Sequence, residues 1–144
     1  MPRRDKFSKK KRSEIMSKIR GKNTKLDLAM KSLLRTARIE FVMYPRIFGN
    51  PDFLVGDRLA IFCDSSFWHG RNWTRLRAQL RNGSNPKYWI GHIASNRRRD
   101  RFVNASLKKE GYVVLRFWDE KIYKRGTECV VRIKTLMEGG CATW

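Results

Sequence analysis

The chain has 144 residues, of which 41% are hydrophobic, so it is long enough and apolar enough to form one domain with a hydrophobic core. It carries 33 lysines and arginines against 13 acidic residues, which gives a formal net charge of +20. Such a charge favours nucleic acid as a partner before an anionic membrane surface, and no apolar stretch approaches the roughly 20 residues of a membrane-spanning helix.

The N-terminal half of the sequence predicts a basic arm, two helices and three strands. Residues 1–12 are strongly basic, lack the apolar core of a signal peptide and are expected to form a flexible arm, with residues 13–144 as the domain. Apolar residues at helical spacing predict helices within residues 12–23 and 23–38. Short apolar runs bounded by proline or glycine predict strands in EFVMYP, PDFLVG and RLAIFC.

The C-terminal half predicts a loop, a long helix, a strand and a final helix. Residues 70–86 are polar, basic and rich in turn residues, which is typical of a surface loop. A helix is expected to begin at Pro86 and to stop at Gly111, followed by a strand in YVVLRFW that is apolar enough to be central. The tail TECVVRIKTLMEGG predicts an amphipathic helix. This order of elements predicts a single α/β domain in which helices sandwich a mixed sheet.

Acidic residues mark the ends of two predicted strands. Asp52 begins one strand, and Asp64 directly follows Cys63 at the end of the next. If these strands form an antiparallel hairpin through VGDR, Asp52 and residues 63–64 meet at one edge of the sheet. Carboxylates and main-chain carbonyls are suitable Mg²⁺ ligands, so Asp52 and the main-chain oxygen of Cys63 are candidates. The alternative is that Asp52 merely follows a proline in a turn.

His69 lies just beyond this strand end. A neutral imidazole beside a metal-held phosphate can take a proton from an attacking water. Asp100, the sole acid in SNRRRDR on the predicted long helix, is a candidate to orient His69 or merely to pair with its arginine neighbours. A lone histidine is more often a structural hydrogen-bonding residue, so both roles stay open for His69. His92 has no acidic neighbour and is interpreted as a helix residue.

Aromatic residues are interspersed with basic ones in the same region. Phe67 and Trp68 are adjacent, so a regular strand cannot bury both, and apolar wedges of this kind unstack base steps in DNA. The alternative is that one ring is buried and the other packs under the loop. Trp73, Tyr88 and Trp89 add further rings to a basic neighbourhood, and this mixture is typical of nucleic-acid binding.

The three cysteines, Cys63, Cys129 and Cys141, are widely spaced and form no CxxC pair. Their pattern indicates neither a disulfide framework nor a cysteine-rich zinc site. It predicts a reducing, intracellular compartment, and we therefore expect a cytoplasmic, nucleoid-associated protein.

Five blocks of the sequence resemble, in order and with compatible spacing, the very short patch repair (Vsr) DNA mismatch endonucleases. The blocks are RSEIMSKIRGKNTKLD, GNPDFLV, AIFCDSSFWHG, PKYWIGHIASNRRRD and GYVVLRFWDEKI, within residues 12–122. The resemblance implies a restriction-endonuclease-like α/β fold and an enzyme that uses Mg²⁺ to nick one DNA strand at a T·G mismatch. The partners that it implies are double-stranded DNA and cellular mismatch-repair factors, with the protein acting as a monomer.

The resemblance also implies roles for individual residues. Asp52 corresponds to the principal metal-binding carboxylate, Cys63 to a main-chain oxygen ligand, and His69 to the general base. Asp100 corresponds to the residue that supports this base. Two further acids match the family pattern less closely: Asp64, where members carry Asp or His beside the metal, and Asp27, where an N-terminal helix acid is usually Glu. The implied DNA contacts are the aromatic wedge Phe67, Trp68 and Trp89 and the basic residues Lys18, Arg20, Lys22 and Lys25.

One part of the family pattern is missing. Many members hold a structural zinc with Cys and His ligands, and the corresponding positions here are Ser66, Arg71, Trp73 and Glu120. None of these supplies a thiolate or an imidazole, so no structural zinc is expected. We expect packing of Trp73 and a contact between Arg71 and Glu120 to replace it.

Two other functions stay open from the sequence. The first is a related site-specific or intron-type DNA endonuclease without a preference for mismatches. The second is a catalytically inactive DNA-binding protein that keeps only the charge and the wedge. Mg²⁺-dependent nicking separates an enzyme from a binding protein, and a comparison of mismatched with matched duplexes separates the two enzymes.

Overall fold

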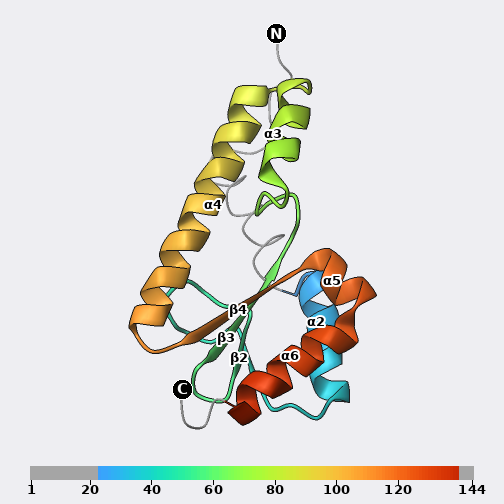
Figure 1. Cartoon of the computed structure of the whole chain (residues 1–144), viewed down its shortest axis with the longest axis vertical. Helices are drawn as coiled ribbons and strands as arrows, with labels where there is room; N and C mark the ends of the chain where they lie inside the picture. Colours follow the sequence, from blue (N-terminus) through green and yellow to red (C-terminus); the bar gives the residue numbers. More distant parts are fainter. Residues whose placement is uncertain (1–22, 140–144) are drawn as a thin grey trace, which may run out of the picture.

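The computed structural model describes residues 23–139, and in this part of the chain a mixed sheet lies between helices (Figure 1). The helices are α2 (Lys25–Thr36), α3 (Trp73–Arg81), α4 (Pro86–Lys109), α5 (Asp119–Lys124) and α6 (Gly126–Gly139). The strands are β1 (Val42–Met43), β2 (Phe53–Val55), β3 (Leu59–Asp64) and β4 (Val113–Trp118). Helix α4 covers one face of the sheet, and α2, α5 and α6 cover the other, which confirms the predicted α/β architecture.

The sheet has the strand order β1-β2-β3-β4. Strands β2 and β3 are antiparallel, with Phe53 opposite Ile61, which confirms the hairpin predicted through VGDR. Strands β3 and β4 are parallel, with Asp64 opposite Trp118, and α3 and α4 make the crossover between them. The start of β2 and the ends of β3 and β4 therefore lie at the same end of the sheet.

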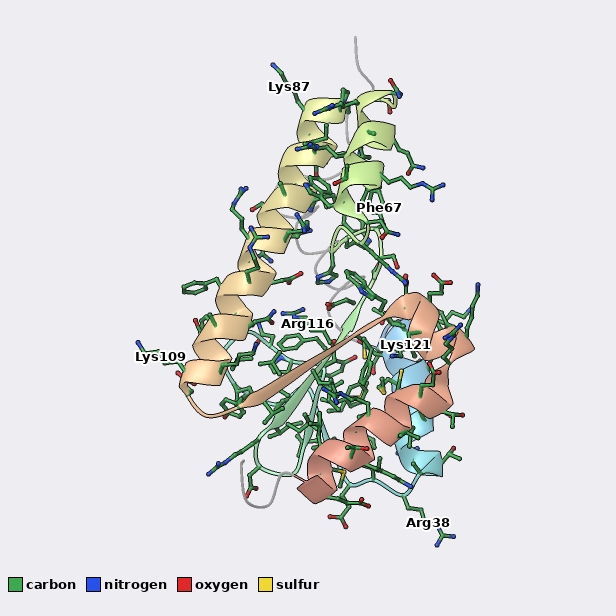
Figure 2. All side chains as sticks on the ribbon, in the orientation of Figure 1. Arg38, Phe67, Lys87, Lys109, Arg116 and Lys121 are labelled. Carbon is green, nitrogen blue, oxygen red and sulfur yellow. The ribbon has the colours of Figure 1, made fainter. Side chains whose placement is uncertain are left out.

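Side chains of β3 alternate between two hydrophobic cores. Leu59 and Ile61 are fully buried on the face that α2, α5 and α6 cover, whereas Ala60 and Phe62 are buried on the α4 face. Figure 2 shows the side chains that fill the spaces between the sheet and both layers of helices. Because the alternation continues to the strand end, Asp64 lies on the α4 face.

The predicted loop over residues 70–86 is wrong, because Trp73–Arg81 form helix α3. No residue of α3 is fully buried, and Trp73, Leu76 and Leu80 form the half-buried side that packs against α4. These apolar residues stand at positions i, i+3 and i+7, which is a helical pattern. The basic and turn-forming residues around them obscure it.

The predicted central position of the YVVLRFW strand is also wrong. In the described part of the sheet, β4 pairs only with β3 and lies at an edge. Its apolar composition reflects helices on both of its faces, not strands on both of its sides.

The short helix α5 was not predicted, whereas α2, α4 and α6 confirm the predicted helices. The basic arm and the helix predicted within residues 12–23 lie outside the described residues, and no described helix is long and apolar enough to cross a membrane.

Candidate active site

Asp52 lies at the start of β2, beside the end of β3. Its backbone N–H donates to the carbonyl of Ile61 (2.9 Å), which extends the pairing of the two strands. Its side-chain Oδ2 accepts a hydrogen bond from the backbone N–H of Cys63 (2.7 Å). The predicted meeting of Asp52 with the end of β3 is therefore present, and the strand pairing itself holds the carboxylate in place.

Helix α2 brings a second carboxylate to this end of the sheet. Thr24 caps the helix by accepting a hydrogen bond from the backbone N–H of Asp27 (3.1 Å), which places Asp27 in the first turn. Asp27 is only 3% exposed, and its Oδ2 accepts a hydrogen bond from the Tyr44 hydroxyl (2.7 Å). The same hydroxyl oxygen accepts a hydrogen bond from the backbone N–H of Asn23. This chain of bonds orients the Asp27 carboxylate.

Asp27, Asp52 and Cys63, here called the acidic cluster, suit a cation. One carboxylate oxygen of each aspartate and the Sγ of Cys63 lie within 4.8 Å of one another. Burial and the neighbouring charge of Asp27 raise the pKa of Asp52 to about 7, and burial raises the pKa of Asp27. Among the described residues, neither carboxylate forms an ion pair with a lysine or arginine. A divalent metal would stabilise this pair of one buried and one partly buried carboxylate, which has no cation among the described residues, so these residues fit Mg²⁺.

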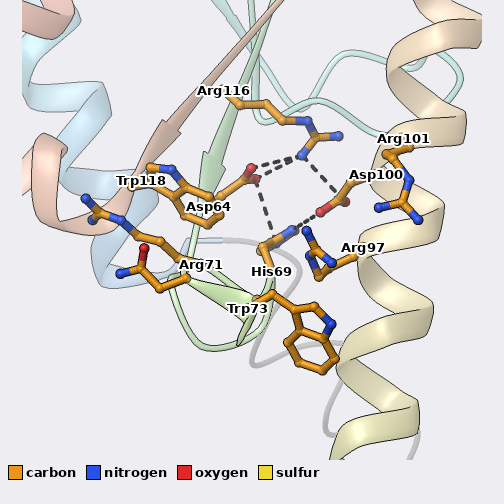
Figure 3. A pocket seen from close by; sticks show the side chains of 11 residues that line it. Asp64, His69, Arg71, Trp73, Arg97, Asp100, Arg101, Arg116 and Trp118 are labelled. Atoms are coloured by element: carbon orange, nitrogen blue, oxygen red, sulfur yellow. Dashed lines mark hydrogen bonds and ion pairs between the residues drawn. The ribbon is translucent and has the colours of Figure 1, made fainter. Parts of the chain in front are cut away.

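His69 lies in the turn after β3, between two other carboxylates. Its Nδ1 lies 2.6 Å from Oδ2 of Asp100 on α4, and its Nε2 lies 3.7 Å from Oδ1 of Asp64 (Figure 3). The carboxylate at Nδ1 favours the tautomer that carries its proton there and leaves Nε2 as an acceptor. Burial lowers the pKa of His69, but the hydrogen bond to Asp100 and the charges of Asp64 and Asp100 raise it, and the net shift is upward.

The turn that carries His69 is held against α4. Asn96 donates a hydrogen bond from Nδ2 to the main-chain oxygen of Trp68 (2.9 Å). Gly70 has a φ of +67°, and a Cβ at this position would lie 2.6 Å from Cδ of Arg97. Both the backbone angle and the close approach therefore require glycine directly after His69.

Arg116 of β4 joins the two carboxylates that flank His69. Its Nη1 lies 3.0 Å from Oδ1 of Asp64 and 3.6 Å from Oδ1 of Asp100, as the dashed lines of Figure 3 show. Its Nε donates to Oδ1 of Asn104 (2.7 Å), so the guanidinium is fixed on two sides. This largely buried cation compensates the charges of Asp64 and Asp100, whereas the acidic cluster has no ion-paired lysine or arginine within residues 23–139.

The imidazole and its neighbours line a cavity of about 340 Å³ (Figure 3). Its other walls include three further arginines and two indole rings: Arg71, Arg97, Arg101, Trp73 and Trp118. Positive charge around a histidine whose Nε2 can accept a proton suits an anionic substrate.

Phe67 and Trp68 form an aromatic cluster with Trp89 of α4. The ring centres of Phe67 and Trp89 are 5.6 Å apart, and those of Trp68 and Trp89 are 5.7 Å apart. Phe67 is 37% exposed, whereas Trp68 and Trp89 are half-buried. Tyr88 stacks on His92 beside them, with an angle of 7° between the rings. The cluster thus presents Phe67 to solvent on a support of two indoles.

Known proteins have sequences similar to this one. The sequence model of the family DNA mismatch endonuclease Vsr matches residues 4–75. The chain is 33% identical over 132 residues to the type II nicking enzyme V.NmeDIP of Neisseria meningitidis serogroup C, covering 90% of this chain and 88% of that protein. It is 29% identical over 117 residues to the DNA mismatch endonuclease Vsr of Escherichia coli strain K12, covering 80% and 73%. The chain belongs to the Vsr family.

A solved structure shares the fold. The catalytic domain of homing endonuclease I-Bth0305I has a TM-score of 0.56 and 18% identity, and the match covers 83% of this Vsr-family chain and 99% of that domain. The predicted restriction-endonuclease-like α/β fold is therefore confirmed. Membership of the Vsr family makes the chain a DNA endonuclease, a hydrolase that acts on phosphodiester bonds.

Other contacts occupy the positions where many Vsr proteins carry zinc ligands. Nη1 of Arg71 lies 3.1 Å from Oε2 of Glu120, so the predicted contact is present. Trp73 packs beneath the guanidinium of Arg97, whose Cζ lies 5.5 Å from the ring centre. Ser66 donates to the Asp119 carboxylate from both Oγ (2.5 Å) and its backbone N–H (3.0 Å).

The predicted DNA-binding cations lie mostly outside the described residues. Lys18, Arg20 and Lys22 precede residue 23, and no position is described for them. Lys25 begins α2, and its Nζ lies 6.0 Å from the ring centre of Tyr123.

Three residues that hold the site were not predicted from the sequence. Asp119 begins a helix directly after a strand, and this position is a signal that could have found it. Tyr44 and Arg116 carry no local signal, because their partners come from elements distant in the sequence.

Proposed function

We propose that this Vsr-family chain is a Mg²⁺-dependent endonuclease that nicks one strand of DNA at a T·G mismatch. The observation that carries the proposal is the pair of carboxylates formed by the buried Asp27 and the partly buried Asp52, which has no cation among the described residues and lies at the end of the sheet that also carries His69. The name of the relative in Escherichia coli supports a mismatch as the target.

In this proposal Asp52 and the main-chain oxygen of Cys63 hold Mg²⁺, and Asp27 adds negative charge beside them. When bound, the ion would polarise the phosphate and stabilise the leaving oxygen. The backbone N–H of Cys63 and the hydroxyl of Tyr44 hold the two carboxylates, so both are oriented before a metal binds.

His69 takes the proton of the attacking water at Nε2. Asp100 holds the proton on Nδ1, fixes the plane of the ring and stabilises the imidazolium that forms. Arg116 compensates Asp64 and Asp100, which reduces the repulsion between these carboxylates and an anionic phosphate in the cavity.

The exposed ring of Phe67 enters the duplex beside the mismatch, supported by Trp68 and Trp89. Unstacking costs a few kcal/mol at a paired step and least at a mismatched one. A wedge at this place therefore favours insertion at T·G over T·A.

The test is strand-specific nicking of end-labelled duplexes, one with a single T·G pair and one fully matched, each with Mg²⁺ and with EDTA. We expect a nick beside the mismatched T in Mg²⁺ and no nick in EDTA. Equal cutting of both duplexes would instead support a site-specific or intron-type endonuclease. Binding without cutting in any divalent metal would support an inactive DNA-binding protein.

A further inference from the structure

Helix α3 and the first part of α4 project away from the sheet side by side, and this region is here called the α3–α4 projection, residues 70–99 (Figure 1). Residues 65–99 contain no acidic residue. They contain eight cations: Arg71, Arg75, Arg77, Arg81, Lys87, Arg97, Arg98 and Arg99. Figure 2 shows Lys87 at the end of α4 that lies far from the sheet, so the positive charge extends to the tip.

The arginines of α3 do not contribute to packing. One side of the helix, formed by Trp73 and two leucines, rests on α4, and Arg75, Arg77 and Arg81 are all exposed. Within residues 23–139 none of the three forms an ion pair. Arg77 and Arg81 are four residues apart on one face, where like charges destabilise a helix. A polyanion bound along the helix would relieve this repulsion.

The projection begins at the catalytic cavity. Asn72 and Trp73, at the start of α3, line the same cavity as His69. A strand positioned for attack beside His69 therefore leaves the cavity next to α3. The 9 residues of α3 span about 13 Å, the length of roughly four base pairs of duplex.

We propose that the α3–α4 projection clamps the DNA backbone, with Arg75, Arg77 and Arg81 binding phosphates up to about four base pairs beyond the nick. The inference rests on the proposed function, because it takes DNA as the substrate, and it adds a binding surface on one side of the cleavage point. Phosphate contacts of this kind increase affinity and fix the position of the duplex without reading its sequence.

The first experiment measures binding of an uncut T·G duplex in EDTA over a series of salt concentrations. The triple variant Arg75→Gln/Arg77→Gln/Arg81→Gln is compared with Arg38→Gln/Arg132→Gln/Lys134→Gln, which removes the same charge from exposed positions away from the projection. We expect the slope of log K against log salt to fall by about 2 to 3 for the first variant, since each phosphate contact contributes about 0.9. The control should retain the wild-type slope to within about one contact.

A second experiment locates the clamp on the DNA. Duplexes are shortened to two base pairs beyond the nick on one side or on the other. We expect wild type to lose about tenfold or more in affinity when one particular side is shortened, and the projection variant to lose little on either side. The single variant Arg77→Gln, which should lower the slope by about one, keeps the test valid if the triple variant does not fold.

Equal salt slopes for the projection variant and the control, with equal responses to shortened duplexes, would overturn the clamp. If wild type nicks DNA normally in that case, the clamp alone is wrong. If wild type neither binds nor nicks DNA, the proposed function fails together with the clamp.

Discussion

The Asp52 carboxylate is held in its charged form at a cost in stability. The folded state raises its pKa from 3.8 to about 7, chiefly through burial. Between about pH 4 and 7 the folded protein therefore binds more protons at this position than the unfolded chain, so the free energy of unfolding decreases as pH rises through this range. The shift corresponds to at most about 4 kcal/mol above pH 7.

Asp52→Asn should therefore stabilise the metal-free protein at pH 8, by at most about 4 kcal/mol, because asparagine carries no charge and can still accept the N–H of Cys63. At pH 4 the two proteins should differ little. Urea unfolding at both pH values in EDTA provides the measurement. Adding Mg²⁺ should stabilise wild type and not the variant. A variant that is less stable than wild type at pH 8 in EDTA would contradict this account of the carboxylate.

The pH dependence of nicking should follow His69. Because a raised pKa keeps the imidazole protonated to a higher pH, the rate should increase through a pKa that lies above 6.5. Asp100→Asn removes the negative charge that, together with its hydrogen bond to Nδ1, raises this pKa, so the acidic limb should move to lower pH and the plateau rate should fall about 10²-fold or more. Single-turnover rates from pH 5 to 9 give both quantities. An unchanged limb in Asp100→Asn would show that His69 is not the titrating base.

Among individual residues, the sequence identified those whose position follows from the neighbouring sequence and missed those whose partners are distant along the chain. Asp52 follows a turn and begins a strand, and His69 follows a strand, so their positions at one edge could be predicted. Arg116 lies in an apolar strand, and its role depends on where α4 places Asp100, which no local pattern specifies. The roles of the predicted residues in metal binding and proton transfer stay predictions.

At the scale of elements, α5 is joined to the turn that carries His69. The Asp119 carboxylate at the start of α5 accepts hydrogen bonds from the hydroxyl and the backbone N–H of Ser66, and also from the backbone N–H of Glu120 (2.7 Å). Burial acts to raise the pKa of Asp119, but these hydrogen bonds outweigh it and lower the pKa. The start of α5, directly after β4, is thereby connected to the turn that follows β3.

Asp119→Ala should destabilise the protein by about 1.5–3 kcal/mol, the contribution of hydrogen bonds to a charged acceptor. Asp119→Asn should retain part of this stability, because its amide oxygen can still accept a hydrogen bond from Ser66. The free energy of unfolding from urea titration measures both changes. A loss of less than about 0.5 kcal/mol in Asp119→Ala would show that the connection between α5 and the turn contributes little.

Which elements could be predicted depended on how much apolar surface each one buries. Helix α2 has a capping threonine and an apolar stripe, and the β2–β3 hairpin has a turn between two apolar runs, so both follow from local patterns. Helix α3 buries no residue fully, and α5 has only Ile122 buried, so their signals are weak. The edge position of β4 depends on the order of strands, which hydrophobicity does not encode.

At the scale of the whole molecule, the charge of +20 should dominate DNA affinity. A protein that neutralises 6–10 phosphates loses about 10³- to 10⁵-fold in affinity between 50 and 200 mM salt. We expect a loss of at least about 10³-fold for a matched duplex, measured by fluorescence anisotropy in EDTA. An affinity that changes less than about tenfold over this range would mean that most of the positive charge faces away from DNA.

The most direct test of the central claim is the single-turnover rate of nicking at a T·G pair as Mg²⁺ is titrated, for wild type, Asp52→Asn and Asp57→Asn. Asp57 lies in the exposed turn between β2 and β3, at the opposite end of this hairpin from Asp52, so its variant removes the same charge without touching the acidic cluster. We predict that Asp57→Asn nicks like wild type and that Asp52→Asn loses about 10³-fold or more, equivalent to about 4 kcal/mol of transition-state stabilisation. A rate for Asp52→Asn within tenfold of wild type, with the same Mg²⁺ dependence, would contradict the assignment of the acidic cluster as the metal site of this nuclease.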